Sequence, residues 1–271
     1  MWEGIILLTL LLLLLLATRC RRSHPGMEAL RGWAYAHRGL HSPGIPENSM
    51  AAFRLALQEG YGAELDIHLL KDGSLGVIHD SQLGRTAGRP GRVEDLVREE
   101  LKTVSLEGTE ETIPELGQVL ELFEGKAPLI IELKTCGDNW EALTETACKR
   151  LEGYRGVYCL ESFDPRCVRY LRKHHPELIR GQLAENFLKS KGGIPYGLKL
   201  LLTHNLLNFW TVPDFIAYRF DHRKDTCSNA ICRRLWKAQG VSWTIRSRED
   251  LDIAVKEGWL PIFEGFSLKN R

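Results

Sequence analysis

Histidine and arginine side chains stand at the ends of two short apolar segments of this sequence. His37 and Arg38 directly follow the segment that ends at Ala36, and His79 ends a second apolar segment. An imidazole titrates near neutral pH, so two of them can exchange the roles of proton donor and proton acceptor. The planar guanidinium of Arg38 matches the geometry of phosphate oxygens. These residue types indicate proton transfer at a phosphate ester that releases an alcohol.

Acidic side chains take similar positions in two further apolar segments. Glu64 and Asp66 are two residues apart, so both point to one side of an extended strand, and Glu132 precedes Lys134 by the same spacing. In a parallel barrel these sides converge at one rim. Three carboxylates in a pocket of low dielectric repel one another, and a divalent cation removes that repulsion. A site with oxygen ligands alone favours Mg²⁺ or Ca²⁺ over zinc, and Lys134 adds a point charge for phosphate.

Short apolar runs alternate with helical patterns along the chain. The predicted strands are Trp33–Ala36, Ala63–Leu69, Leu75–His79, Leu129–Leu133, Val157–Leu160, Ile179–Leu183, Phe215–Tyr218, Val241–Ile245 and Leu260–Phe263. The predicted helix N-caps are Asn48, Thr112 (in a box with Glu115, and Pro114 in the first turn), Asp138, Asp164 and Ser247, and the predicted stops include Gly60, Gly125, Gly153 and Gly258. Alternating strands and helices imply parallel strands with the helices packed outside.

Nine predicted strands compete for the eight places of a (β/α)8 barrel. Lys71–Gly73 joins the second and third strands by a tight turn with no crossover helix, which indicates a hairpin-like excursion. An open doubly wound sheet is the alternative fold, but no G-x-G-x-x-G motif follows the first strand. The sequence therefore predicts an α/β protein, a TIM-type (β/α)8 barrel over residues 33–271 with a hydrophobic helix before it.

Length and composition are those of a chain with one large domain. The 271 residues come close to the ~250 that are typical of α/β barrels. A net charge of +1, from 36 basic and 35 acidic residues, provides no field of one sign, so nucleic acid is not an expected partner. The seven cysteines include no CxxC pair, and we predict mostly buried, reduced thiols, as in a reducing compartment.

Residues 1–22 form a separate and strongly apolar segment. The run from Gly4 to Thr18 is nearly all leucine, Glu3 precedes it, and three arginines follow it. As a helix the run spans ~22 Å, short of the ~30 Å hydrocarbon core of a bilayer. Positive charge after the run favours a membrane anchor with the following domain in the cytoplasm, and a signal sequence cleaved during export is the alternative. An ordinary core helix is disfavoured because the run has no polar face.

A second apolar segment, Tyr196–Trp210, lies within the predicted domain. Its leucines recur at helical spacing, at Leu198, Leu201, Leu202 and Leu206. A barrel helix that packs inward would explain this pattern. Contact with a membrane near the N-terminal helix is the alternative.

Several motifs follow one another in a definite order between residues 33 and 134. They read AHRGL, PENSMAAF, GYGAELDIHLLKDGSLGVIHD, RTAGRPG, IPELGQVLELF and LIIELK. In this order they resemble the glycerophosphodiester phosphodiesterase family, and a looser similarity continues through Glu161–Phe163 and Val241–Thr244. The resemblance implies a TIM barrel that uses a divalent metal to hydrolyse glycerophosphodiesters to an alcohol and sn-glycerol 3-phosphate, in glycerophospholipid metabolism.

The resemblance also implies roles for individual residues. These are His37 and His79 as the general acid/base pair, Arg38 as a phosphate ligand, Glu64, Asp66 and Glu132 as metal ligands, and Glu47 and Lys134 in the lining of the site. Phe163 and Trp243 are candidates for an apolar wall against the substrate, with a core role as the alternative. A neighbouring glycerol hydroxyl would attack phosphorus first, and water would then open the cyclic phosphate. The final strand departs from the family pattern G-I-I-T-D-x-P, because Glu264 stands in the place of aspartate and no proline follows.

Three functions are compatible with these residues. The first is hydrolysis of small glycerophosphodiesters or lysolipids. The second is a phospholipase of the D type that acts on intact lipid, for which Tyr196–Trp210 would be an interfacial element. The third is a non-catalytic, membrane-tethered binding barrel, which would have no need of two imidazoles beside three carboxylates. We therefore expect an enzyme.

Overall fold

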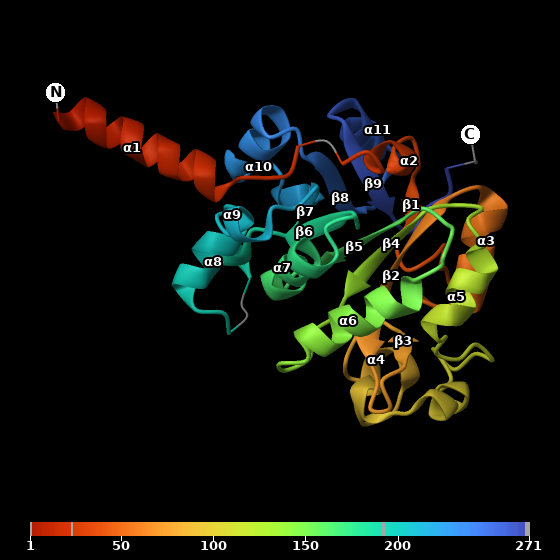
Figure 1. Ribbon diagram of the computed structural model, residues 1–271. Coiled ribbons are helices and arrows are strands. Elements are labelled where there is room, and N and C mark those ends of the chain that lie inside the picture. Colours follow the sequence, from red (N-terminus) through yellow and green to blue (C-terminus); the bar gives the residue numbers. More distant parts are fainter. Residues whose placement is uncertain (1, 23, 191–192, 269–271) are drawn as a thin grey trace.

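Eight parallel strands close into a barrel in the computed structural model, which describes residues 2–22, 24–190 and 193–268 (Figure 1). The barrel strands are β1 (Tyr35–Ala36), β2 (Gly62–Leu69), β4 (Leu129–Leu133), β5 (Tyr158–Ser162), β6 (Arg180–Ala184), β7 (Phe215–Arg219), β8 (Gln239–Ile245) and β9 (Trp259–Phe263). β1 pairs in parallel with both β2 and β9, which closes the ring. The predicted (β/α)8 barrel is confirmed.

The ninth strand, β3 (Leu75–Val77), lies outside the ring. It pairs antiparallel with β2, with His68 opposite Gly76. Gly73 in the connecting turn has φ +83°, a left-handed conformation that glycine adopts without strain. The predicted hairpin-like excursion is therefore confirmed, and the residues after β3 return towards the barrel.

Helices cover the outside of the barrel (Figure 1). The longer ones are α3 (Met50–Glu59), α5 (Leu116–Phe123), α6 (Trp140–Leu151), α7 (Pro165–His174), α8 (Tyr196–Thr203) and α11 (Arg248–Lys256). Shorter helices are α2 (Met27–Leu30), α4 (Gly84–Ala87), α9 (Asn208–Thr211) and α10 (Ser228–Ala230), with 3₁₀ turns at Val93–Asp95, Arg98–Thr103, Phe187–Lys189 and Phe220–His222 and a π-helical turn at Ile231–Leu235.

Apolar side chains fill the part of the barrel near the N-terminal ends of the strands. There α2 supplies Met27 and Leu30, which belong to one buried cluster with Phe215 of β7. Tyr35 is fully buried in the same cluster, and its hydroxyl donates to the carbonyl of Leu30 at 2.7 Å. All seven cysteines are free, and those that are buried are Cys20, Cys148, Cys159, Cys167 and Cys232. Because this end is packed with apolar groups, the polar side chains of the interior are left to the opposite end.

Two predicted helix caps are confirmed and one moves by a single residue. The side chains of Asp164 and Ser247 accept hydrogen bonds from backbone N–H groups in the first turns of α7 and α11. At α3 the cap is Ser49, whose side chain accepts from the N–H of Ala52 at 3.1 Å. The prediction of Asn48 was wrong because its amide is used elsewhere, donating to Asp66 Oδ2 at 2.8 Å.

The helix caps predicted at Thr112 and Asp138 were also displaced. Glu115 is itself the cap of α5, because its carboxylate accepts from the N–H of Gly117 and Gln118 bonds back to its backbone N–H. Thr112 instead forms a β-bridge with Ser105, and Pro114 therefore precedes the helix. Asn139 takes the cap position of α6, one residue after the predicted aspartate.

The N-terminal helix α1 (Trp2–Ala17) extends away from the barrel (Figure 1). It has 16 residues, and none of them is buried. Within the described parts of the chain, no helix has both the length and the apolar character needed to cross a membrane, so the predicted transmembrane helix is not supported. After α1 the chain is held on the barrel, since Arg21 forms an ion pair with Asp214 and the Arg22 guanidinium lies 5.5 Å from the centre of the Trp236 ring.

The apolar segment Tyr196–Trp210 forms α8, a turn and α9. Leu202 packs inward against a buried cluster that includes Tyr218 and Phe220. The side chains that remain exposed are Tyr196, Leu198, Leu201 and Phe209. The segment thus has an inward face, as the helix interpretation predicts, and an exposed apolar face as well.

Candidate active site

The side chains predicted to do chemistry converge at the C-terminal ends of the strands. There they line a cavity of about 170 Å³. Its lining includes His37, Arg38, Glu64, His79, Glu132, Lys134, Phe163 and Trp243. Asp66 is buried next to them in β2, whereas Glu47 lies outside the lining. The C-terminal end of the strands is where (β/α)8 barrels carry their active sites.

Glu64, Asp66 and Glu132 form one buried acidic cluster. Each offers an oxygen, and these oxygens lie within 4.8 Å of one another. The pairing of β2 with β4 places Asp66 beside Glu132, and the spacing of two residues puts Glu64 on the same face as Asp66. The local cause of the cluster is therefore strand register combined with alternation of side chains.

Electrostatics makes this cluster a fitting place for a cation. Burial raises the pKa of Glu64, and the neighbouring charges of Asp66 and Glu132 raise it further. Burial and Asp66 also raise the pKa of Glu132, to about 7, against the opposing effect of Lys134. Carboxyl groups that resist ionisation together become fully charged when a divalent cation lies between them. Their oxygen-only donor set fits Mg²⁺ or Ca²⁺.

Lys134 sits between two of the three acids. Its Nζ lies 3.0 Å from Asp66 Oδ1 and 2.8 Å from Glu132 Oε1. Burial alone would lower the pKa of Lys134, but the two carboxylates raise it, so the ammonium group is charged. Burial would likewise raise the pKa of Asp66, but Lys134, His79 and Arg38 hold it below its usual range. The ammonium group is thus a fixed positive charge beside the acidic cluster.

The two imidazoles each contact a carboxylate through Nδ1. The distance is 2.5 Å from His37 to Glu264 Oε2 and 2.6 Å from His79 to Asp80 Oδ1. Because a carboxylate only accepts, Nδ1 carries the proton in each ring and Nε2 is left as the acceptor of the neutral form. Burial is the main cause that lowers the pKa of both histidines, despite the raising effect of their carboxylates. Both rings can therefore accept a proton near neutral pH.

Glu264, the residue that departs from the family pattern, contacts several side chains besides His37. Arg246 Nη2 lies 2.7 Å from its Oε1, and His41 Nε2 lies 3.6 Å from its Oε2. His37, His41 and Glu264 also offer ligand atoms within 4.8 Å of one another. A cation is less suited to this group than to the acidic cluster, because Arg246 already neutralises its single carboxylate. Neither His41 nor Arg246 was predicted from the sequence.

Arg38 is held in place from several sides. Its Nη1 donates to Glu47 Oε1 at 2.9 Å, and its backbone N–H donates to Glu64 Oε2 at 3.0 Å. Glu47 also accepts from Arg85, whose Nε donates to Asp80 at 2.5 Å. Glu47 thus lies behind Arg38 rather than in the cavity, and one chain of ion pairs joins Arg38 to the partner of His79.

Aromatic rings form the remaining side of the cavity. The rings of Phe163 and Trp243 meet edge to face, with centroids 5.5 Å apart, and both line the cavity. The indole N–H of Trp243 donates to the carbonyl of Ala217 at 3.1 Å, which fixes the ring. Leu183 and Ile262 add aliphatic surface. The cavity is thus charged on one side and apolar on the other.

Two functional candidates escaped the sequence reasoning. Glu161 is buried beside Glu132 in register, and its Oε2 has no hydrogen-bond partner in the described structure. Burial, and then the charge of Glu132, raise its pKa well above the usual value. His68 is buried and contacts the backbone oxygen of His79 at 3.1 Å through Nε2. The signal for Glu161 was present, since it directly follows the predicted strand Val157–Leu160.

Comparison with known proteins shows that the chain is a phosphodiester hydrolase built on a (β/α)8 barrel. The glycerophosphoryl diester phosphodiesterase family matches residues 37–193, which is more than half of the chain. The chain therefore belongs to the glycerophosphoryl diester phosphodiesterase family. The predicted family and enzyme class are confirmed.

Relatives and solved structures agree with this assignment. A glycerophosphodiester phosphodiesterase of Caldanaerobacter subterraneus subsp. tengcongensis is 30% identical over 236 residues, which are 82% of this chain and 89% of the relative. One of Bacillus altitudinis is 41% identical over 130 residues, 45% of this chain and 53% of the relative. The fold is similar to that of an Oleispira antarctica phosphodiesterase in complex with the product sn-glycerol-3-phosphate, with a TM-score of 0.71, 22% identity and coverage of 88% of this chain and 94% of that one.

Proposed function

We propose that this protein hydrolyses glycerophosphodiesters to an alcohol and sn-glycerol 3-phosphate, as part of glycerophospholipid metabolism and with a divalent cation held by Glu64, Asp66 and Glu132. The observation that carries the proposal is that this acidic cluster and two carboxylate-bound imidazoles line or adjoin one cavity. Membership of the family supports the substrate class. When bound, Mg²⁺ or Ca²⁺ would neutralise charge on the phosphoryl oxygens.

Arg38 and Lys134 bind and orient the phosphodiester in this mechanism. The guanidinium can contact two phosphoryl oxygens at once, and the ammonium group acts as a point charge. Their charges are maintained because Glu47 holds Arg38 and two carboxylates raise the pKa of Lys134. Phe163 and Trp243 offer the apolar side to the glycerol or the leaving alcohol. The proposal thus gives a binding role to each wall of the cavity.

The two histidines transfer the protons. His37 Nε2 takes the proton of the glycerol hydroxyl next to the phosphate as that oxygen bonds to phosphorus. His79 gives a proton to the departing alcohol oxygen as its bond to phosphorus breaks. We assign the donor role to His79 because its side chain is 30% exposed against 12% for His37, so its protonated form is better solvated. Water then opens the cyclic phosphate while the two rings exchange roles.

An assay of glycerophosphocholine hydrolysis tests this proposal. We expect release of sn-glycerol 3-phosphate that stops on addition of EDTA and returns with Mg²⁺ or Ca²⁺. We expect His37→Ala and His79→Ala each to reduce kcat by about 10²- to 10⁴-fold. Full activity with chelator present, or in either variant, would contradict the proposed chemistry.

Action on intact lipid in a bilayer, as a phospholipase of the D type, is the second candidate function. The exposed apolar face of α8 and α9, with Tyr196, Leu198, Leu201 and Phe209, favours it, because apolar surface of this kind suits contact with lipid. Hydrolysis of phosphatidylcholine vesicles without hydrolysis of glycerophosphocholine would select this function. Hydrolysis of glycerophosphocholine alone would exclude it.

We also propose that α1 attaches the enzyme to a membrane surface, with the catalytic domain in the cytoplasm. The support is that none of its residues is buried and that most of its leucines are exposed, which is costly in water. Removal of the segment during export is the alternative. These cases are distinguished by fractionating cells that express either the full chain or a chain lacking residues 2–17. Protease treatment of intact spheroplasts then shows on which side of the membrane the catalytic domain lies. Recovery of the full-length chain in the soluble fraction would refute attachment to the membrane.

A further inference from the structure

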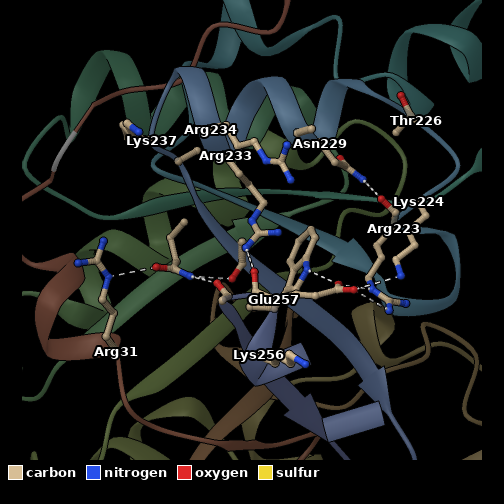
Figure 2. Close-up of a pocket in the computed structure, with 16 residues that line it drawn as sticks. Arg31, Arg223, Lys224, Thr226, Asn229, Arg233, Arg234, Lys237, Lys256 and Glu257 are labelled. Atoms are coloured by element: carbon tan, nitrogen blue, oxygen red, sulfur yellow. Dashed lines mark hydrogen bonds and ion pairs between the residues drawn. The ribbon is translucent and has the colours of Figure 1, made fainter. Parts of the chain in front are cut away.

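A large cavity lies at the end of the barrel opposite to the catalytic cavity. It has a volume of about 830 Å³ and is lined by residues at the N-terminal ends of β8 and β9, including Gln239, Gly240, Gly258 and Trp259. The catalytic residues stand at the C-terminal ends of the strands, so the two cavities share no lining residue. We call this second cavity the basal pocket (Figure 2).

The charge of the basal pocket is almost all of one sign. Among the described residues that line it, the cationic ones are Arg31, Arg223, Lys224, Arg233, Arg234, Lys237 and Lys256, and the one carboxylate is Glu257. Figure 2 shows Arg31 on one side of Glu257, with Arg223 and Lys224 on the other side. The whole chain has a net charge of only +1, so this cluster is a local concentration of positive charge.

Glu257 does not balance this charge. Arg223 Nε lies 2.8 Å from Glu257 Oε2, and Lys224 Nζ lies 3.2 Å from its Oε1. Hydrogen bonds from these two cations are the main causes that lower the pKa of Glu257, to about 2. Within the described parts of the chain, no ion pair is found for Arg234, Lys237 or Lys256. Three cations of the pocket thus lack a carboxylate partner in the described structure.

The pocket is built by ordered contacts. The Arg233 guanidinium lies 3.9 Å from the centre of the Trp259 ring and donates to the carbonyl of Glu257 at 2.5 Å. A Cβ at Gly240 would lie 2.6 Å from Arg233 Nε and 2.5 Å from the Trp259 ring, so only glycine permits this stack. On the other side, Arg31 Nε donates to Gln239 Oε1 at 3.1 Å. Two of the cations are therefore oriented before any ligand arrives.

We propose that the basal pocket binds an organic anion that carries two or more phosphate groups. Guanidinium groups bind phosphate oxygens in pairs, and lysines add point charges, so this set of side chains matches phosphate better than a single carboxylate. The volume falls in the range of pockets for small molecules and exceeds what one phosphate would fill. Nucleic acid is a poorer match, because the Trp259 ring is buried and already covered by Arg233. The same phosphate chemistry could come from a soluble metabolite or from a lipid head group.

Calorimetry with inorganic tripolyphosphate tests the soluble source, in EDTA so that no metal contributes. We compare the full chain with R234Q/K256Q in the pocket and with K71Q/K102Q, a matched loss of two exposed lysines outside it. We expect R234Q/K256Q to bind tripolyphosphate about tenfold more weakly or worse, because each substitution removes a hydrogen bond between a cation and a charged phosphate oxygen. We expect K71Q/K102Q and Arg38→Ala, which removes a cation from the catalytic cavity, to bind like the unmodified protein.

Sedimentation with vesicles tests the lipid source. Vesicles of phosphatidylcholine alone measure any binding through α1, and vesicles with added phosphatidic acid measure the contribution of phosphate. A gain with phosphatidic acid that R234Q/K256Q loses and K71Q/K102Q keeps, without tripolyphosphate binding, assigns the pocket to a lipid head group. Unchanged thermal unfolding and glycerophosphocholine hydrolysis in R234Q/K256Q serve as the folding control. Failure of both probes to bind, equal weakening in both double variants, or loss in Arg38→Ala alone would overturn the proposal.

Discussion

The two ends of the barrel differ in how their charged side chains are combined. At the C-terminal end, Glu64, Asp66, Glu132 and Glu161 are buried together, and the pKa values of Glu64, Glu132 and Glu161 are raised. At the N-terminal end, seven cations surround Glu257, whose pKa is lowered to about 2. The first end combines buried carboxylates with cations such as Arg38 and Lys134, whereas the second has a single carboxylate among its cations. The same strands can therefore present a cation site at one end and an anion site at the other.

The largest expected effect comes from the acidic cluster. We predict that Asp66→Asn reduces kcat for glycerophosphocholine by at least about 10³-fold, because the variant keeps the shape of the side chain but removes a charge that a cation needs. Glu257→Gln, at the other end of the barrel, is the control and should stay within about twofold of the unmodified protein. If Asp66→Asn kept more than a tenth of the kcat of the unmodified protein, the acidic cluster would not be the cation site of the enzyme.

Glu264 is predicted to act as a positioning residue through His37. Glu264→Gln should reduce kcat by about 10²-fold with little change in KM, because the carboxylate orients the ring and stabilises its protonated form. Since Glu264 raises the pKa of His37, its loss should also move the acidic limb of the pH profile to lower pH. Glu264→Asp should restore part of the rate. An unchanged pH profile in Glu264→Gln would leave Glu264 with a structural role only.

Glu132 and Glu257 should make stability depend on pH in opposite directions. The pKa of Glu132 is raised to about 7 in the metal-free fold, so the protein loses roughly 3 kcal/mol of stability as pH rises from about 4.5 to 7, because the carboxyl group ionises more readily in the unfolded chain. The pKa of Glu257 is lowered to about 2, so its contribution is present above about pH 4.5 and is lost as pH falls. Because Glu257 is partly exposed, we expect only about 1 kcal/mol from it.

Urea unfolding of Glu132→Gln and Glu257→Gln between pH 3 and 8, in EDTA, measures these contributions. Glu132→Gln should remove part of the loss of stability at high pH, and Mg²⁺ or Ca²⁺ should remove it in the unmodified protein. Glu257→Gln should lower stability only above about pH 4.5. The same pH dependence in both variants would mean that the two ends do not differ as described.

The smallest expected effect concerns the cap of α3. Ser49→Ala should lower the free energy of unfolding by about 1 kcal/mol and leave kcat unchanged, because Ser49 caps the helix but does not reach the cavity. Asn48→Ala should instead lower kcat, since Asn48 donates to Asp66. Denaturant unfolding and the glycerophosphocholine assay separate the two residues. Reversed effects would restore Asn48 as the cap.

The barrel and its acidic cluster could be predicted because both depend on local periodicity. Alternation places Glu64 and Asp66 on one face, and parallel pairing carries Glu132 to the same height. These rules apply to any parallel barrel and need no knowledge of loops. The hairpin at β3 could be predicted from local sequence as well, because the turn that joins β2 to β3 is too short to contain a helix.

The parts that escaped prediction depend on contacts between loops. His41 and Arg246 lie in loops and Arg85 lies in the short helix α4, and the sequence gives no periodic pattern that would place each beside its carboxylate. The prediction for Asn48 failed for a similar reason. Asn48 is a suitable cap residue, but its side-chain amide donates to Asp66, which the sequence alone does not indicate. The basal pocket was missed because its cations lie on helices and connecting segments that are far apart in sequence.

The central claim is that Glu64, Asp66 and Glu132 together hold one divalent cation, and Mn²⁺ binding tests it most directly. Electron paramagnetic resonance of the metal-free protein titrated with Mn²⁺ should show one tight site per chain, which Mg²⁺ or Ca²⁺ displaces. Asp66→Asn and Glu132→Gln should each abolish that site, while Glu264→Gln should retain it. A tight site that persists in both variants of the acidic cluster, or that disappears in Glu264→Gln, would contradict the account.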